Sequence, residues 1–125
     1  MRLATLLSNV ALIGLLACSG EATTTEPVLR ARTAPWGVQV SNATDRPIYY
    51  MVVEAAYAMT AFIVPCTDPA RCAPVPPGEV VIVPYSAITG YTKDARAAMV
   101  YSWHLEPAAD GRFSLVGFRG VVVKL

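Results

Sequence analysis

The feature that most constrains the fold is a series of short apolar segments separated by turn residues. In 36–40, apolar residues alternate with small or polar ones, and this period of two is typical of a strand with one buried face. Proline, glycine, asparagine and aspartate between the segments predict turns. Roughly six to eight strands within about 90 residues predict an all-β fold, a small antiparallel β-sandwich, with a small β-barrel as the alternative.

The expected strands and their buried faces follow from the same alternation. We expect strands at 36–40, 48–54, 79–85, 97–105, 113–116 and 118–125, with 28–33 as an additional edge strand. We expect three sets of side chains in the core: Trp36, Val38 and Val40; Met99, Tyr101, Trp103 and Leu105; and Val121, Val123 and Leu125. The outward face of 97–105 would then carry Val100, Ser102 and His104.

The first 17 residues have the plan of a secretory signal. Arg2 makes a short positive region, 3–16 is mostly apolar, and the small residue Ala17 precedes the expected cleavage site. The apolar run is shorter than the roughly 20 residues that a transmembrane helix needs. We therefore expect residues 1–17 to be a signal peptide that is removed from the mature protein.

The end of this segment, Leu15-Leu16-Ala17-Cys18, resembles the lipobox of bacterial lipoproteins. The resemblance covers only these four residues and the apolar run before them. It implies cleavage before Cys18 and attachment of lipid to that cysteine, which would then hold the protein on a membrane of the cell envelope. Because serine and not aspartate follows Cys18, the resemblance implies the periplasmic side of the outer membrane.

The mature chain divides into a tether and one domain. Residues 18–35 hold little to bury and are expected to form a flexible tether, whereas 36–125 has the length of an immunoglobulin-like sandwich. Tyr91, placed before the strand that contains Trp103, resembles the tyrosine corner of immunoglobulin-like domains. The inter-sheet disulfide of that family is absent.

The remaining cysteines, Cys66 and Cys72, predict a disulfide. They are separated by five residues that include Asp68-Pro69, and paired cysteines are typical of exported chains. A redox pair would be spaced Cys-x-x-Cys. A structural zinc site needs four ligands, and the chain has a single histidine.

Charge argues against a nucleic-acid partner. The full chain has 10 basic and 9 acidic residues, so removal of Arg2 with the leader leaves nine of each. The arginines are scattered along the sequence, whereas nucleic-acid binders carry a basic patch or stripe. The same scatter argues against electrostatic adhesion to anionic lipid, so we expect the membrane contact to come from the N-terminal lipid.

One segment suggests recognition. Residues 48–53 are apolar on both faces, which a strand with one buried face does not require. Either a loop covers the outer face, or Tyr49, Met51 and Val53 belong to an exposed binding patch. We therefore expect a non-catalytic binding or assembly domain, with an envelope protein or a glycan as its partner and no cofactor.

Two alternatives remain. A periplasmic copper-handling lipoprotein could use Met51, Met59, Met99 and His104, because thioethers suit copper(I). A small envelope hydrolase would need two carboxylates that meet in the fold, and the spacing of the acidic residues nominates no pair. One histidine and no Gly-x-Ser-x-Gly motif also make a Ser-His-Asp enzyme an unfavoured interpretation.

Overall fold

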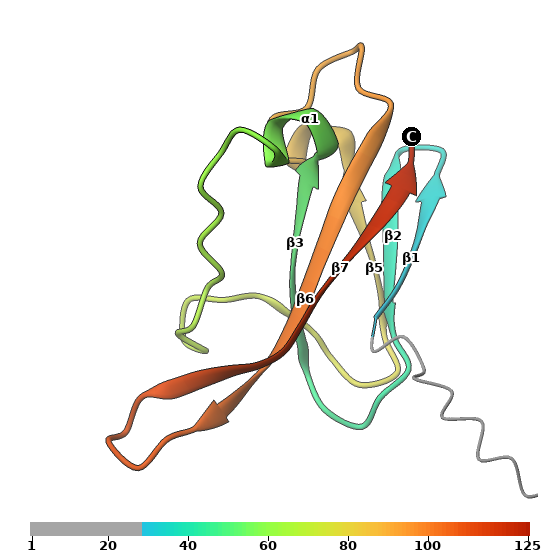
Figure 1. Ribbon diagram of the computed structural model, residues 1–125. Coiled ribbons are helices and arrows are strands. Elements are labelled where there is room, and N and C mark those ends of the chain that lie inside the picture. Colours follow the sequence, from blue (N-terminus) through green and yellow to red (C-terminus); the bar gives the residue numbers. More distant parts are fainter. Residues whose placement is uncertain (1–28) are drawn as a thin grey trace, which may run out of the picture.

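A computed structural model describes residues 29–125 and shows an all-β sandwich of two antiparallel sheets that do not close into a barrel (Figure 1). The three-stranded sheet has the order β1-β2-β5, and the four-stranded sheet has the order β4-β3-β6-β7. The elements are β1 (Leu29–Ala34), β2 (Gly37–Asn42), β3 (Ile48–Glu54), α1 (Ala55–Ala58), β4 (Pro74–Val75), β5 (Val80–Pro84), η1 (Tyr85–Ala87), β6 (Ala97–Pro107) and β7 (Phe113–Lys124).

This strand order is that of an immunoglobulin-like sandwich. If the strands are lettered in chain order with β5 as E, the sheets are A-B-E and C′-C-F-G, and the second holds the G-F-C arrangement of the family. The chain crosses between the sheets three times, from β2 to β3, from β4 to β5 and from β5 to β6. The predicted fold class is therefore confirmed, and the barrel alternative is wrong.

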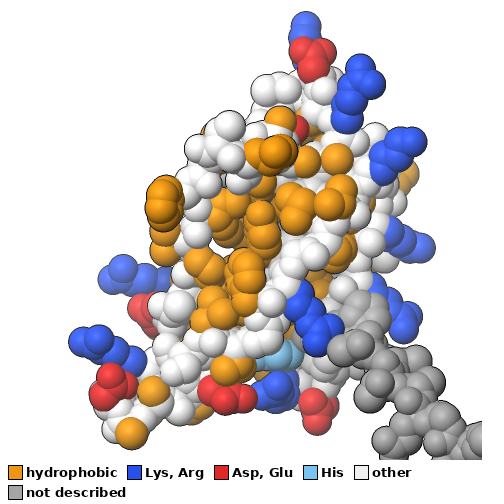
Figure 2. All heavy atoms as spheres, viewed as in Figure 1, with side chains coloured by type: hydrophobic (Ala, Val, Ile, Leu, Met, Phe, Trp, Pro, Cys, Tyr) orange, Lys and Arg blue, Asp and Glu red, His pale blue; other side chains and the backbone are white. Residues whose placement is uncertain are grey.

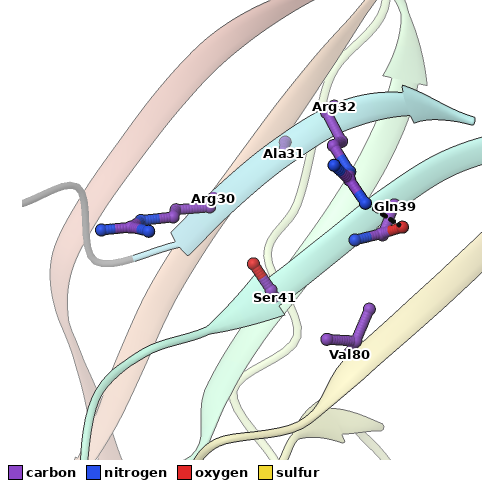
Figure 3. A pocket seen from close by; sticks show the side chains of 6 residues that line it. All are labelled: Arg30, Ala31, Arg32, Gln39, Ser41 and Val80. Atoms are coloured by element: carbon purple, nitrogen blue, oxygen red, sulfur yellow. Dashed lines mark hydrogen bonds between the residues drawn. The ribbon is translucent and has the colours of Figure 1, made fainter.

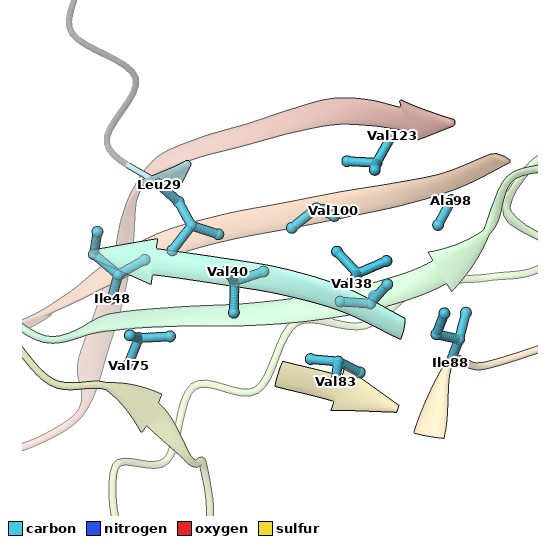
Figure 4. Packing of buried hydrophobic residues seen from close by; sticks show 11 residues of the cluster. Leu29, Val38, Val40, Ile48, Val75, Val83, Ile88, Ala98, Val100 and Val123 are labelled. Carbon is cyan, nitrogen blue, oxygen red and sulfur yellow. The ribbon is translucent and has the colours of Figure 1, made fainter. Parts of the chain in front are cut away.

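The core lies between the two sheets (Figure 4). It is built from β-branched and aliphatic side chains of both inner faces, because such residues pack well on a pleated surface. Half-buried side chains, among them Tyr50, Tyr85 and Tyr91, pack around it. The buried cluster consists of Leu29, Val38, Val40, Ile48, Val52, Val75, Val83, Ile88, Ala98, Val100 and Val123.

The predicted orientation of β6 is wrong. Ala98 and Val100 are fully buried in the core, and Ser102 and His104 are 5% and 7% exposed. These four side chains form the inner face of β6. The set that includes Met99 and Tyr101 faces outward instead. The expectation failed because the outer face is also apolar, and hydrophobicity alone does not distinguish two apolar faces.

Three smaller differences concern the ends of strands. Trp36, expected in the core, lies in the β1–β2 turn with 71% of its surface exposed, whereas Val38 and Val40 are buried as expected. The edge strand expected at 28–33 is present as β1, so 29–34 of the range expected for the tether belong to the sandwich. The two expected C-terminal strands are one strand, β7.

Asn42 anchors the connection between the sheets. Its side chain is 2% exposed, and its Nδ2 donates to the carbonyl oxygens of Arg46 and Val75 at 2.6 and 2.9 Å. Its Oδ1 accepts from the backbone N–H and the hydroxyl of Thr44 at 2.8 and 2.6 Å. One buried amide therefore fixes the β2–β3 turn and joins it to β4.

Candidate binding face

The outer face of the four-stranded sheet is apolar and aromatic. Strand register places Tyr49 opposite Trp103, Met51 opposite Tyr101, and Val53 opposite Met99. On the other side of β6, Tyr101 faces Gly120 and Met99 faces Val122. In Figure 2 hydrophobic side chains gather in the middle of the visible face, over β3, β6 and β7. We call this surface the apolar face; its accessible members are Tyr49, Met51, Met99, Tyr101, Phe118 and Val122.

An aromatic cluster crosses this face from β6 to β7. The ring of Phe118 stacks on Tyr101 with centroids 5.5 Å apart and on Trp103 with centroids 6.1 Å apart. Phe118 remains 45% exposed. Offset aromatic pairs at this separation add stability beyond the area that they bury, so Phe118 is held as a rigid, accessible ring.

A β-bulge sets the position of Phe118. Ser102 pairs with Arg119, and His104 pairs with Val116, so two residues of β7, Gly117 and Phe118, lie opposite Trp103. Gly117 has φ 65°, a left-handed conformation that glycine adopts without steric cost. The extra residue in β7 turns the ring of Phe118 across Tyr101 and Trp103.

The loop from Met59 to Ala73 closes one end of the apolar face. The disulfide between Cys66 and Cys72 is present, as predicted, and the indole Nε1 of Trp103 donates to the carbonyl oxygen of Cys66 at 3.0 Å. Trp103 is consequently 1% exposed. The first half of the loop presents apolar side chains to solvent: Met59, Phe62 and Val64 are 88, 102 and 78% exposed.

The three residues predicted as a patch therefore have different environments. Val53 is 1% exposed, and Tyr49 and Met51 are half-buried. Val53 is covered where Thr89 bridges to it, with the Thr89 N–H donating to the carbonyl of Val52 at 3.1 Å. The larger accessible part of the face comes from β6 and β7. Phe118 and Val122 were missed because β7 was expected to contribute only its inner side.

The four residues of the copper alternative do not form one site. Met51 and Met99 lie on the outer face, and Met59 follows α1 in the exposed loop. His104 lies on the inner side of β6, where its Nδ1 is 3.0 Å from the carbonyl oxygen of Pro47. Among residues 29–125, no group of three or more histidine, cysteine or acidic side chains is arranged to hold a metal ion.

Four acidic side chains have partners in the structure. Asp68, Glu106 and Asp110 pair with Arg71, Arg46 and Arg112 at 3.5, 3.3 and 3.8 Å. These pairs are exposed and contribute little to stability. Glu54 caps α1, because its Oε2 accepts from the backbone N–H of Tyr57 at 2.7 Å.

The charged pairs lie outside the apolar face. The face consists of uncharged residues, so its free energy of contact with a partner comes from apolar burial and aromatic packing. A hollow of about 320 Å³ lies beyond it, where the disulfide loop meets the β6–β7 turn. That hollow is lined by Thr67, Asp68, Gly111, Arg112 and Phe113.

Burial also perturbs one titratable group beneath the face. Tyr50 points to the inner side of β3 and packs against the core. Desolvation raises the pKa of its phenol above the ordinary value of 10.0. Tyr50 is therefore a neutral structural side chain near neutral pH.

The proposed lipid site, Cys18, and the expected leader and most of the tether lie outside the described residues. Within 29–125 no helix is long and apolar enough to cross a membrane. No known protein family matches the sequence, and comparison with curated proteins and with solved structures likewise finds no significant match.

Proposed function

We propose that the chain is a lipid-anchored cell-envelope protein whose immunoglobulin-like sandwich is a non-catalytic binding module for another envelope protein. The observation that carries the proposal is the apolar face, with exposed Phe118 and Val122 and with Met59, Phe62 and Val64 beside it. A contiguous apolar surface is costly to expose and is typical of a protein interaction site. Aromatic and methionine side chains are enriched at the centres of such interfaces.

The chemistry of the face favours a protein partner over a glycan. Sugar recognition needs hydrogen-bonding groups beside the stacking ring, and the indole N–H of Trp103 is already used by Cys66. The accessible groups are mainly aliphatic, aromatic and thioether. Methionine side chains adapt to irregular apolar partners, so Met51 and Met99 suit the apolar side chains of a protein segment.

The anchor follows from the resemblance of Leu15-Leu16-Ala17-Cys18 to a lipobox. Two or three acyl chains hold a protein stably on a bilayer, at about 0.8 kcal/mol per buried methylene. Mass spectrometry of the N-terminal peptide of the mature protein tests this part. We expect a chain that begins at acylated Cys18, and an unmodified cysteine or a retained leader would overturn it.

Site-specific photo-crosslinking in native membranes tests the binding face. A photoreactive residue at Val122, and separately at Phe118, should capture the same discrete protein. The matched control is Val80, which is 55% exposed on the other sheet and should not capture it. Phe118→Ser should weaken capture from position 122. Equal capture from positions 80 and 122, or no captured protein, would contradict the proposed face.

A further inference from the structure

The outer face of the three-stranded sheet is organised differently from the apolar face. Strand register forms one cross-strand row of Arg30, Ser41 and Val80. A second row consists of Arg32, Gln39 and Ile82. Each row runs from a guanidinium on β1, over a polar side chain on β2, to a β-branched apolar side chain on β5. We call this surface the basic face.

The basic face is hollowed and carries unbalanced positive charge. A cavity of about 300 Å³ lies over it, and Arg30, Arg32, Gln39, Ser41 and Val80 are among the residues that line it (Figure 3). The strands β1, β2 and β5 contain no acidic residue. In Figure 2 basic side chains line the margin of the molecule where Figure 1 places β1 and β2.

This combination fits the headgroup region of an anionic bilayer. A guanidinium is suited to phosphate oxygens, because it offers several N–H donors in a fixed plane. Val80 and Ile82 are 55 and 49% exposed, and they would contact the apolar region just below the phosphates. Trp36, 71% exposed in the β1–β2 turn, belongs to the residue type that is enriched at membrane interfaces.

The position of the described N-terminal end brings this face to the membrane. β1 begins at Leu29, directly before Arg30. If Cys18 carries the lipid, only residues 19–28 separate the anchor from β1, and ten residues span at most about 35 Å. β1, which carries both Arg30 and Arg32, is therefore the first strand after the anchor in the sequence.

We propose that the basic face lies flat on anionic phospholipid headgroups, so that the apolar face on the opposite side of the sandwich points away from the membrane toward its partner. The proposal rests on the lipid anchor of the proposed function. One arginine near an anionic surface shifts the equilibrium toward the surface-bound orientation by about fivefold. Arg30 and Arg32 therefore orient the anchored domain without holding it on the membrane by themselves.

Fluorescence quenching by lipids with a nitroxide headgroup tests the orientation. Lipidated protein is placed on vesicles of phosphatidylcholine alone, or of phosphatidylcholine with phosphatidylglycerol. Trp36 lies in the β1–β2 turn, which follows the end of β1 farthest from Leu29, so its quenching reports a sheet that lies flat. Trp103, 1% exposed in the other sheet, gives a constant background. We expect stronger quenching on the anionic vesicles, with loss of the difference at about 1 M NaCl, where the Debye length is about 3 Å.

Paired variants make the test specific. The double variant Arg30→Gln with Arg32→Gln should quench on anionic vesicles only as much as on neutral ones. Loss of each arginine should shift the equilibrium away from the surface-bound orientation by about fivefold. The matched control is Arg71→Gln with Arg112→Gln, because these exposed arginines pair with Asp68 and Asp110 within their own turns. The control should quench like the unmodified protein, and circular dichroism checks that each variant is folded.

The outcomes separate this inference from the anchor. Protein that fails to float with either type of vesicle would contradict the proposed function. Protein that floats with both but shows equal Trp36 quenching on both would overturn the orientation and leave the anchor standing. If inorganic phosphate abolishes the quenching at an ionic strength where chloride does not, the basic face binds a small phosphate ligand, and the membrane as its occupant is wrong.

Discussion

The indole N–H of Trp103 donates a hydrogen bond to the carbonyl oxygen of Cys66, with 3.0 Å between nitrogen and oxygen. This contact links a strand at the centre of the four-stranded sheet to a loop that is closed by the Cys66–Cys72 disulfide. The loop in turn covers Trp103, against which Phe118 stacks. The loop and the accessible aromatic ring of the apolar face are therefore coupled through one buried indole.

Trp103→Phe should lower the free energy of unfolding by about 1–2 kcal/mol, because a buried hydrogen bond and part of an aromatic contact are lost. Urea unfolding followed by circular dichroism measures the change. Trp36→Phe is the control, since Trp36 is 71% exposed, and it should shift stability by less than about 0.5 kcal/mol. Equal losses in the two variants would contradict the role of the Trp103 contact.

Asn42→Ala should cost about 3 kcal/mol of unfolding free energy. The substitution removes four hydrogen bonds and leaves the buried carbonyl of Val75 without this donor. Gln39→Ala on the same strand loses only a partly exposed contact with Arg32 and should change stability by about 0.5 kcal/mol or less. Thermal unfolding of both variants is the measurement, and a neutral Asn42→Ala would show that the β2–β3 turn does not need this amide.

Gly37→Ala should destabilise the protein by about 3 kcal/mol or prevent folding, because a Cβ at this position would overlap the carbonyl oxygen of Val83. The obstructing atoms belong to the backbone of β5 and cannot move without disturbing the sheet. At Gly120 a Cβ meets only side-chain atoms of Met99 and Tyr101, at 3.2 Å. Gly120→Ala should therefore fold. Soluble yield and melting temperature of the two variants are the measurements, and both should be lower for Gly37→Ala than for Gly120→Ala.

Stability should fall as the pH rises above about 10 because of Tyr50. Burial raises the pKa of its phenol in the folded state above the value of 10.0 that applies when it is solvated. Above that pH the unfolded chain has fewer bound protons than the folded one, so the free energy of unfolding decreases with pH. The stabilisation is complete below the unfolded pKa and is lost as pH rises through the folded pKa.

Tyr50→Phe provides the test for this alkaline loss. Its free energy of unfolding, measured in urea from neutral pH to about pH 11, should decrease less steeply than that of the unmodified protein, because a phenylalanine side chain does not ionise. Tyr57→Phe is the control, since Tyr57 is 44% exposed. Identical pH slopes for Tyr50→Phe and the unmodified protein would show that another group causes the alkaline loss.

The all-β class, the positions of the longer strands and the disulfide could be predicted from the sequence, because each leaves a local pattern. The inner side of β6 could not. Met99 and Tyr101 are larger and more apolar than Ser102, yet they lie outside because β6 has apolar residues on both sides and register with β3 decides between them. Hydrophobicity identifies a strand, whereas its orientation depends on contacts that are distant in the sequence.

The candidate site shows the same limit. Tyr49 and Met51 were recognised because their strand is apolar on both faces. Phe118 and Val122 were not, since their contribution depends on pairing between β6 and β7 and on the bulge at Gly117. The closeness of Arg30 and Arg32 on one face likewise follows only once β1 is known to be a strand of the folded sheet.

The bulge in β7 has a consequence for contacts between copies of the protein. β7 is the edge strand of its sheet and is long enough to attract a β-strand of a neighbouring molecule. The irregularity at Gly117 and Phe118, followed by the charge of Arg119, interrupts the straight ladder of backbone groups that such a neighbour would need. The bulge therefore disfavours edge-to-edge pairing of β7 with a strand of a neighbouring molecule.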